Sequence, residues 1–220
     1  MFSVNSVVNF TQGIVIKQNE TFANVSGIEI ENSVDALVEE NYTHDNTAGI
    51  LVFVLPGKTA TEGADTRVVN NRIENNTLKN FARPEMTVAL VPPGTGLLII
   101  SADTTDVTGN TFQGNKSVAV GIVAVTDFPD FFKQAKWDIP VLPENNHIHG
   151  NTYINNGYDP DPVLLEVGLQ GRDLLWSTAG DGNRWDETGA TMYPEPLPTS
   201  RWPAFARRAF WRIINFLAHL

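Results

Sequence analysis

The 220-residue sequence contains no cysteine, which excludes disulfides, thiolate metal sites and cysteine nucleophiles. No apolar run reaches the roughly 18 residues that a membrane-spanning helix needs. Residues 1–10 lack a basic segment followed by an apolar one, so we see no signal peptide and expect a cytosolic protein or a chain lacking the start of a longer one. Basic residues are also scarce, with a net charge of −10, and this acidity argues against a nucleic-acid partner.

Asparagine is abundant and periodic. Pairs of asparagines five residues apart recur along the chain, and Val or Ile always stands three residues before the first member. The first members are Asn19, Asn41, Asn71, Asn110 and Asn151, and the second members are Asn24, Asn46, Asn76, Asn115 and Asn156. A period that begins at 22 residues, with several short β-forming runs in each repeat, indicates an all-β solenoid whose coils stack as a parallel β-helix.

The repeated asparagine has two physical explanations at a tight bend. Asparagine adopts the left-handed backbone conformation at lower cost than other non-glycine residues. Its side-chain amide both donates and accepts hydrogen bonds, so amides stacked from coil to coil would form a ladder. We therefore expect Asn41, Asn71 and Asn110 to lie in one column.

A glycine followed by an apolar strand recurs at Gly27, Gly49, Gly96 and Gly121. From Gly49 onward both faces of these strands are apolar, so the outward residues, such as Leu51 and Leu98, should be covered. Three insertions interrupt the repeat, and long loops of this kind are usually functional or covering structure. They span residues 56–66, 77–95 and 126–146, and we expect them, or the C-terminal helix, to cover this face.

Residues 159–200 lose the repeat and are rich in Gly, Pro and Asp, which predicts an irregular tail packed on the solenoid. Trp176 and Trp185 would form an aromatic platform for a sugar, or would pin this tail to the solenoid; we favour the second, because tryptophan is most often a packing residue. The predicted domains are a parallel β-helix over 1–158, the irregular tail over 159–200 and an amphipathic basic helix over 201–220.

The last segment carries four arginines and no acidic residue. On a helical wheel Arg207, Arg208, Arg212, Asn215 and His219 share one arc with Trp211, and apolar residues fill the other. The helix would bind a membrane surface through residues 203–220, or would cap the end or apolar flank of the solenoid. Capping is favoured, because solenoid ends need covering.

Few residues suggest chemistry. His44 and Asp45 are adjacent at a bend, where they would abstract a proton from a sugar or would be an ordinary turn pair. Under the enzyme alternative His44 is the candidate base, Asp45 its orienter, and Arg67 and Asp103 the charge neutralisers. His147 and His149 share one face of a strand, but no third ligand is close in sequence, so we predict no metal site. Nucleotide-binding, serine-hydrolase and zinc-protease motifs are absent from the sequence.

The segments GIEIENS, NYTHDNTAGILVFVLPG, NFA and LLW with GDGN resemble the bacterial right-handed parallel β-helix repeat proteins of the pectate-lyase-like superfold, within an uncharacterised secreted or lipoprotein branch. The likeness covers about residues 1–198 and implies a right-handed, single-stranded parallel β-helix. It also implies an extracellular or periplasmic location, with this chain matching the C-terminal part of longer relatives. Characterised members of the superfold are lyases, epimerases and glycosidases, but their motifs do not occur here, and fold alone does not confer activity.

These observations predict an extracytoplasmic β-helix scaffold that binds a carbohydrate or a protein partner through its inserted loops. The alternatives are a lyase or epimerase acting on an acidic polysaccharide and a membrane-associated structural protein. No cofactor is predicted, apart from Ca²⁺ under the lyase alternative. Catalysis stays open, with a non-catalytic role favoured.

Overall fold

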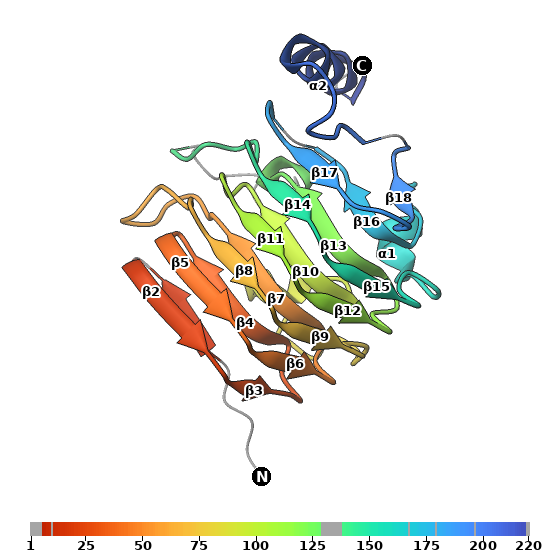
Figure 1. Ribbon diagram of the computed structural model, residues 1–220. Coiled ribbons are helices and arrows are strands. Elements are labelled where there is room, and N and C mark those ends of the chain that lie inside the picture. The colour runs from red at the N-terminus through yellow and green to blue at the C-terminus, as the bar shows by residue number, and fades with distance from the viewer. Residues whose placement is uncertain are drawn as a thin grey trace.

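The computed structural model describes residues 6–9, 11–128, 138–166, 168–178, 180–195 and 197–218. In these residues the chain winds repeatedly through three parallel sheets, which we call A, B and C, so that each coil stacks on the one before it (Figure 1). The predicted all-β parallel β-helix is confirmed.

Sheet A has the strand order β1-β4-β7-β10-β13-β16-β18, and sheets B and C run alongside it. The strands of sheet A are β1 (Ser6–Asn9), β4 (Ser26–Glu31), β7 (Ala48–Phe53), β10 (Thr95–Ile100), β13 (Val118–Val123), β16 (Arg172–Trp176) and β18 (Met192–Tyr193). Those of sheet B are β2 (Gln12–Lys17), β5 (Val34–Glu39), β8 (Arg67–Val69), β11 (Asp106–Thr108), β14 (His147–His149) and β17 (Arg184–Asp186). Those of sheet C are β3 (Glu20–Thr21), β6 (Tyr42–His44), β9 (Arg72–Glu74), β12 (Thr111–Gln113) and β15 (Thr152–Ile154).

The core fills the interior of the coils. In sheet B the Val or Ile that precedes each asparagine points inward, and Val38, Val68 and Val107 stack in register and are fully buried. In sheet A, Ile50 pairs with Leu97 in the same way. Alternation along each strand therefore places the neighbouring residues on the outer face.

The asparagines form the predicted ladder. The Nδ2 of Asn41 donates to Oδ1 of Asn71 at 2.9 Å, and the Nδ2 of Asn71 donates to Oδ1 of Asn110, also at 2.9 Å. The second members of the pairs form a parallel column, in which Asn46 donates to Asn76 at 3.0 Å. A third, unpredicted column joins Asn146 to Asn183 at 2.9 Å.

The left-handed backbone position is not where we expected it. It belongs to the residue just before each ladder asparagine, with φ between 50° and 68°, and glycine fills three of these positions in the later coils. These positions are Gln18, Glu40, Asn70, Gly109 and Gly150 in the first column and Ala23, Asp45, Asn75, Gly114 and Asn155 in the second. The ladder asparagines are therefore explained by their amides and not by backbone tolerance.

Both main columns end on a carboxylate. The Nδ2 of Asn151 donates to Oε1 of Glu187 at 2.7 Å, and the Nδ2 of Asn156 donates to Oδ1 of Asp173 at 3.1 Å. Each amide donates toward the C-terminal end of the solenoid, so an acceptor closes each column.

The glycine column runs through sheet A but differs from the predicted one at its last member. A Cβ on Gly27 would lie 2.6 Å from the carbonyl oxygen of Gly49, and one on Gly49 would lie 2.6 Å from that of Gly96. Ala119 follows in this column, because Leu97 pairs with Val120 and Leu98 pairs with Gly121. The predicted register at Gly121 was therefore two residues too late. Because side chains alternate with a period of two, the predicted inward and outward faces are still correct.

The prediction of an irregular tail is wrong for residues 172–193. Strands β16 and β18 extend sheet A and β17 extends sheet B, with Ile148 paired to Trp185 in register. The solenoid therefore continues beyond residue 158, although the asparagine repeat does not.

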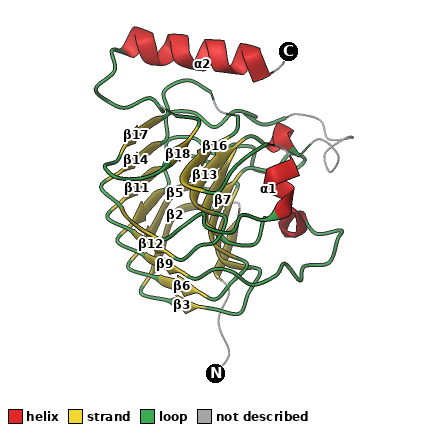
Figure 2. Ribbon diagram, turned by 90° about the vertical axis from the view of Figure 1, so that its right-hand side faces the viewer, coloured by secondary structure: helices red, strands yellow, loops and turns green. Residues whose placement is uncertain are grey.

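The inserted loops cover the outer face of sheet A, as predicted. Leu51, Leu98 and Val123 are only 1%, 5% and 6% exposed. The second insert contributes the short helix η1 (Thr87–Leu90), and η2 (Val125–Asp127) and α1 (Pro162–Glu166) come from later connections. Figure 2 shows α1 on this side of the solenoid, near β13 and β16.

Helix α2 (Ala204–Ala218) lies across the C-terminal end of the solenoid (Figure 2). Trp211 is fully buried, and its ring centroid lies 4.8 Å from that of Trp176 and 5.7 Å from that of Trp185. This contact is the predicted cap. The helix places Trp211 inward, so much of its apolar arc faces outward, with Phe205 71% and Phe216 65% exposed. His219 lies outside the described residues.

Candidate functional site

Four polar side chains gather on the outer face of sheet B, on three neighbouring strands. Asp106 opens β11, His147 and His149 flank the inward Ile148 on β14, and Asp186 ends β17. Because Asp106 pairs with His147 in register and His149 pairs with Asp186, the stacking of the coils brings these side chains together.

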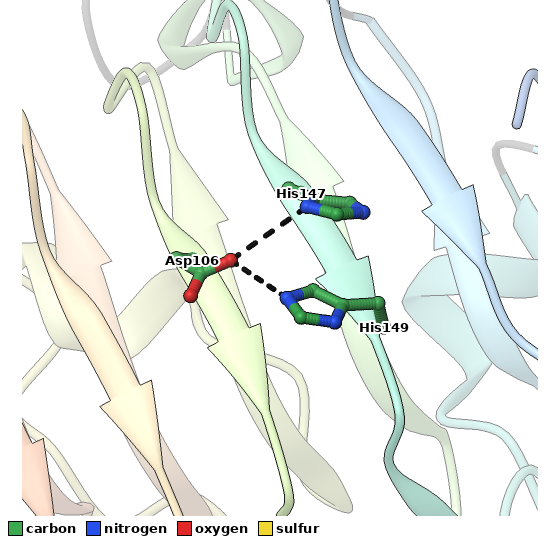
Figure 3. Close-up of side chains that lie close together, drawn as sticks. All are labelled: Asp106, His147 and His149. Atoms are coloured by element: carbon green, nitrogen blue, oxygen red, sulfur yellow. Dashed lines mark hydrogen bonds and ion pairs between the residues drawn. The ribbon is translucent and has the colours of Figure 1, made fainter. Parts of the chain in front are cut away.

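The side chains of Asp106, His147 and His149 lie close together (Figure 3). Nε2 of His149 lies 2.9 Å from Oδ1 of Asp106, and Nδ1 of His147 lies 3.8 Å from the same oxygen. The two imidazole rings stack with their centroids 4.0 Å apart. All three side chains are partly exposed, so solvent reaches the cluster.

Asp186 holds the far side of His147, with Nε2 of the ring 2.7 Å from Oδ2 of the carboxylate. Burial lowers the pKa of His147 and outweighs the opposing effect of Asp186, which favours a neutral ring. Burial opposes ionisation of Asp186 itself, but hydrogen bonds from Ser200 and His147 bring its pKa below the usual value. The cluster therefore combines a neutral imidazole with an ionised carboxylate behind it.

Two imidazoles and a carboxylate are ligand types for a transition metal and also suit acid–base chemistry. The prediction of no metal site depended on the lack of a third ligand near His147 in sequence. The structure places the carboxylate of Asp106 beside both histidines, from the preceding coil and 41 residues away from His147 in sequence. The repeat carried a signal for it, because Asp106 and His147 each stand directly before the Val or Ile of the motif.

The residues suggested for catalysis lie in different parts of the solenoid. His44 ends β6 in sheet C, where its Nδ1 lies 2.7 Å from Oδ2 of Asp45 and its ring stacks on Tyr42. Asp103 lies at the corner before β11 and accepts a hydrogen bond from the backbone N–H of Glu144. The structure therefore does not gather His44, Asp45 and Asp103 into one site.

Arg67, the fourth of these residues, opens β8 and pairs in register with Asp106. It is exposed and lies one strand away from the His–Asp cluster on the same face of sheet B. Arg184 of β17 pairs with His147 on the other side. A row of Arg67, Asp106, His147 and Arg184 thus crosses the outer face of sheet B.

Trp176 and Trp185 are 4% and 1% exposed, because Trp211 and the core enclose them. This arrangement matches the packing interpretation. A sugar platform at these residues is contradicted, since stacking on a sugar requires an exposed ring face.

A separate chamber of about 600 Å³ lies between the outer face of sheet A and the loops that cover it. Its lining comes from the second insert, from the connection around α1 and from strands β10, β13 and β16. Apolar lining residues include Leu90, Val91, Leu98, Val123, Leu164, Leu169 and Leu175, and polar ones include Lys79, Asp127, Asp161 and Ser177.

A chain that winds through stacked parallel sheets with columns of like side chains is a parallel β-solenoid. Residues 3–129 match the family described as the right handed beta helix region, and the chain belongs to this family. Neither a search of curated proteins nor one of solved structures found a match.

Proposed function

We propose that this protein is a non-catalytic β-helix scaffold that binds a ligand through its inserted loops, in the chamber against sheet A. The observation that carries the proposal is the chamber itself, whose volume of about 600 Å³ is in the range of small-molecule sites. The extracytoplasmic location implied by the resemblance is part of this proposal.

The lining favours a largely apolar ligand over a bare carbohydrate. Leu98, Val123 and Leu175 form the floor, and Leu90 and Val91 contribute from the covering loop. A sugar entering such a site would leave hydroxyl groups without partners, at a cost of about 1–3 kcal/mol for each buried group. Lys79, Asp127 and Asp161 would meet the polar end of the ligand.

The test is titration of the full chain with the fluorescent apolar probe 1-anilinonaphthalene-8-sulfonate, alongside a polysaccharide panel with and without Ca²⁺. Gly121→Val fills the floor, because the added Cβ would meet only side-chain atoms, the flexible end of Leu98 at 2.9 Å and a methyl group of Val118 at 4.0 Å. We expect saturable probe binding that this variant weakens at least fivefold. Thr152→Val, on an exposed position of β15, is the matched control.

Equal probe binding by the two variants would contradict the proposal. Binding or turnover of a polysaccharide, unaffected by Gly121→Val, would favour the lyase or epimerase alternative instead.

Peripheral membrane contact through α2 is a second candidate function. The outward face of this helix combines Phe205, Phe216 and Leu217 with Arg208 and Arg212, all exposed. Apolar side chains flanked by arginine suit the interface of an anionic bilayer. Among the described residues, the structure contains no helix with the length and apolarity to cross a membrane.

Co-sedimentation with vesicles tests this second candidate. We expect the chain to bind vesicles of phosphatidylserine and phosphatidylcholine, to bind pure phosphatidylcholine weakly, and to lose binding in Phe216→Ser. Leu165→Ser removes another exposed apolar side chain, from α1, and should leave binding unchanged. If both variants lose vesicle binding, or if the parent chain binds to neither type of vesicle, α2 is not the membrane contact.

A further inference from the structure

We propose that Asp106, His147 and His149 bind a divalent transition-metal ion of the zinc type, with the remaining coordination position open to solvent. The three side chains offer one ligand atom each, and these atoms all lie within 4.8 Å of one another. The site is independent of the chamber against sheet A, because it lies on the outer face of sheet B.

The spacing of the donor atoms suits such an ion. In a tetrahedral zinc site with bonds of about 2.1 Å, the ligand atoms lie about 3.4 Å apart. Oδ1 of Asp106 lies 2.9 Å from Nε2 of His149 and 3.8 Å from Nδ1 of His147. These two values bracket the required separation, and the third, between the two histidine nitrogens, is within 4.8 Å, so side-chain adjustment would admit the ion.

The other nitrogen of each ring has its own polar neighbour, as is usual for metal-binding histidines. Nε2 of His147 lies 2.7 Å from Oδ2 of Asp186, and Nδ1 of His149 lies 3.5 Å from the hydroxyl of Thr108. Asp186 is fixed in turn by the backbone N–H of Ser200, at 2.7 Å. These contacts direct Nδ1 of His147 and Nε2 of His149 toward Asp106.

The contact between His147 and Asp106 points to a cation. When Nε2 of His147 carries the proton and donates it to Asp186, Nδ1 presents a lone pair to the carboxylate of Asp106, 3.8 Å away. Two acceptors then face each other, an arrangement that a metal ion between them would convert into two favourable bonds.

The ligand types select among metals. Imidazole nitrogen suits Zn²⁺, Cu²⁺, Co²⁺ and Ni²⁺, whereas Ca²⁺ and Mg²⁺ prefer sites built only from oxygen. Three protein ligands on a partly exposed surface leave room for water as the fourth. The ion would join two coils, because Asp106 belongs to β11 and both histidines belong to β14.

The experiment uses the full chain without an affinity tag, freed of metal by a chelator and then titrated with Zn²⁺ in a calorimeter. We expect one Zn²⁺ per chain. His149→Gln and Asp106→Asn should each weaken binding at least tenfold, and loading with Co²⁺ should give the visible absorption band of a four-coordinate ion.

His44→Gln is the matched control, since His44 also contacts two carboxylates, those of Asp45 and Glu20, but within the described part of the chain it has no second histidine among its contacts. Circular dichroism identifies any variant that fails to fold, and the remaining variant of the pair then decides. The proposal is overturned if Zn²⁺ does not bind, or if a folded His149→Gln or Asp106→Asn protein binds it as tightly as the parent.

Discussion

Asn71 and Asn110 are joined by a side-chain hydrogen bond of 2.9 Å although 39 residues separate them in sequence. Asn71 also accepts from Asn41 and donates to the backbone carbonyl of Val38, so its buried amide is hydrogen-bonded on both sides. A rung in the middle of the ladder thus ties three consecutive coils together.

Replacing this rung should therefore be costly. We expect Asn71→Ala to lower the free energy of unfolding by about 3 kcal/mol, because several buried groups lose their partners. Asn75→Gly is the control: Asn75 is exposed and has a φ of 51°, which glycine adopts readily. Chemical denaturation measures both, and equal stability of the two variants would show that the ladder contributes little.

The glycine column gives a second prediction, about close packing of backbones. A Cβ on Gly49 would lie 2.6 Å from the carbonyl oxygen of Gly96, which is backbone and cannot easily move. We expect Gly49→Ala to destabilise the fold by about 2 kcal/mol. Gly121→Ala should cost much less, since its nearest neighbour is the flexible end of Leu98. Thermal melting of the two variants compares them, and the reverse order would be evidence against the register described here.

The tryptophan contact at the end of the solenoid predicts the importance of the cap. Trp211→Ala should lower the free energy of unfolding by about 3 kcal/mol, because a large, fully buried side chain leaves a cavity against Trp176 and Trp185. Phe205→Ala, on the exposed side of the same helix, should change stability by less than about 0.5 kcal/mol. Denaturation followed by tryptophan fluorescence measures both, and a stable Trp211→Ala protein would mean that α2 does not hold the end of the fold.

A fourth prediction concerns pH. Burial raises the pKa of Asp103 from 3.8 to about 6, against the effect of its hydrogen bond from Glu144. The unfolded chain therefore loses this proton at lower pH than the folded chain does, and stability falls as pH rises from about 4 to about 6. Asp103→Asn keeps the acceptor oxygen and removes the charge.

We expect Asp103→Asn to be more stable than the parent by about 1 kcal/mol at pH 7, since partial exposure reduces the full effect. The difference should disappear below pH 4. Thermal melts from pH 4 to pH 7 measure it, with Asp159→Asn, an exposed carboxylate, as the control. A constant difference across this range would assign the effect to packing instead of charge.

The sequence predicts the fold well wherever one residue has the same role in every coil. Asn41, Asn71 and Asn110 recur because each amide bonds to the next, so the column can be read directly from the spacing. The strands within residues 172–193 were not predicted, because the residue that recurs in the earlier coils is missing from them. Their coil meets the ladders through Asp173 and Glu187, and carboxylates break the asparagine pattern while the strands continue.

The His–Asp cluster could be predicted only in part. His147 and His149 stand two residues apart and are visible as a pair, but Asp106 reaches them through the stacking of coils. An insertion between β13 and β14 lengthens that coil, so a search for ligands close in sequence misses Asp106. Comparing residues at the same phase of the repeat would have placed Asp106 beside the two histidines.

The carboxylates of Glu187 and Asp173 give the two asparagine columns a direction and an end. Within a column, Nδ2 of each asparagine donates to the next coil and Oδ1 accepts from the previous coil. The side-chain amide dipoles of a column are therefore aligned. A carboxylate accepts a hydrogen bond but has no N–H group to donate, so each row of side-chain amides stops there. The columns of amides therefore end at these two residues, and the stacking beyond Asp173 uses a different contact, in which the backbone N–H of Thr191 donates to Oδ2 of Asp173 at 2.9 Å.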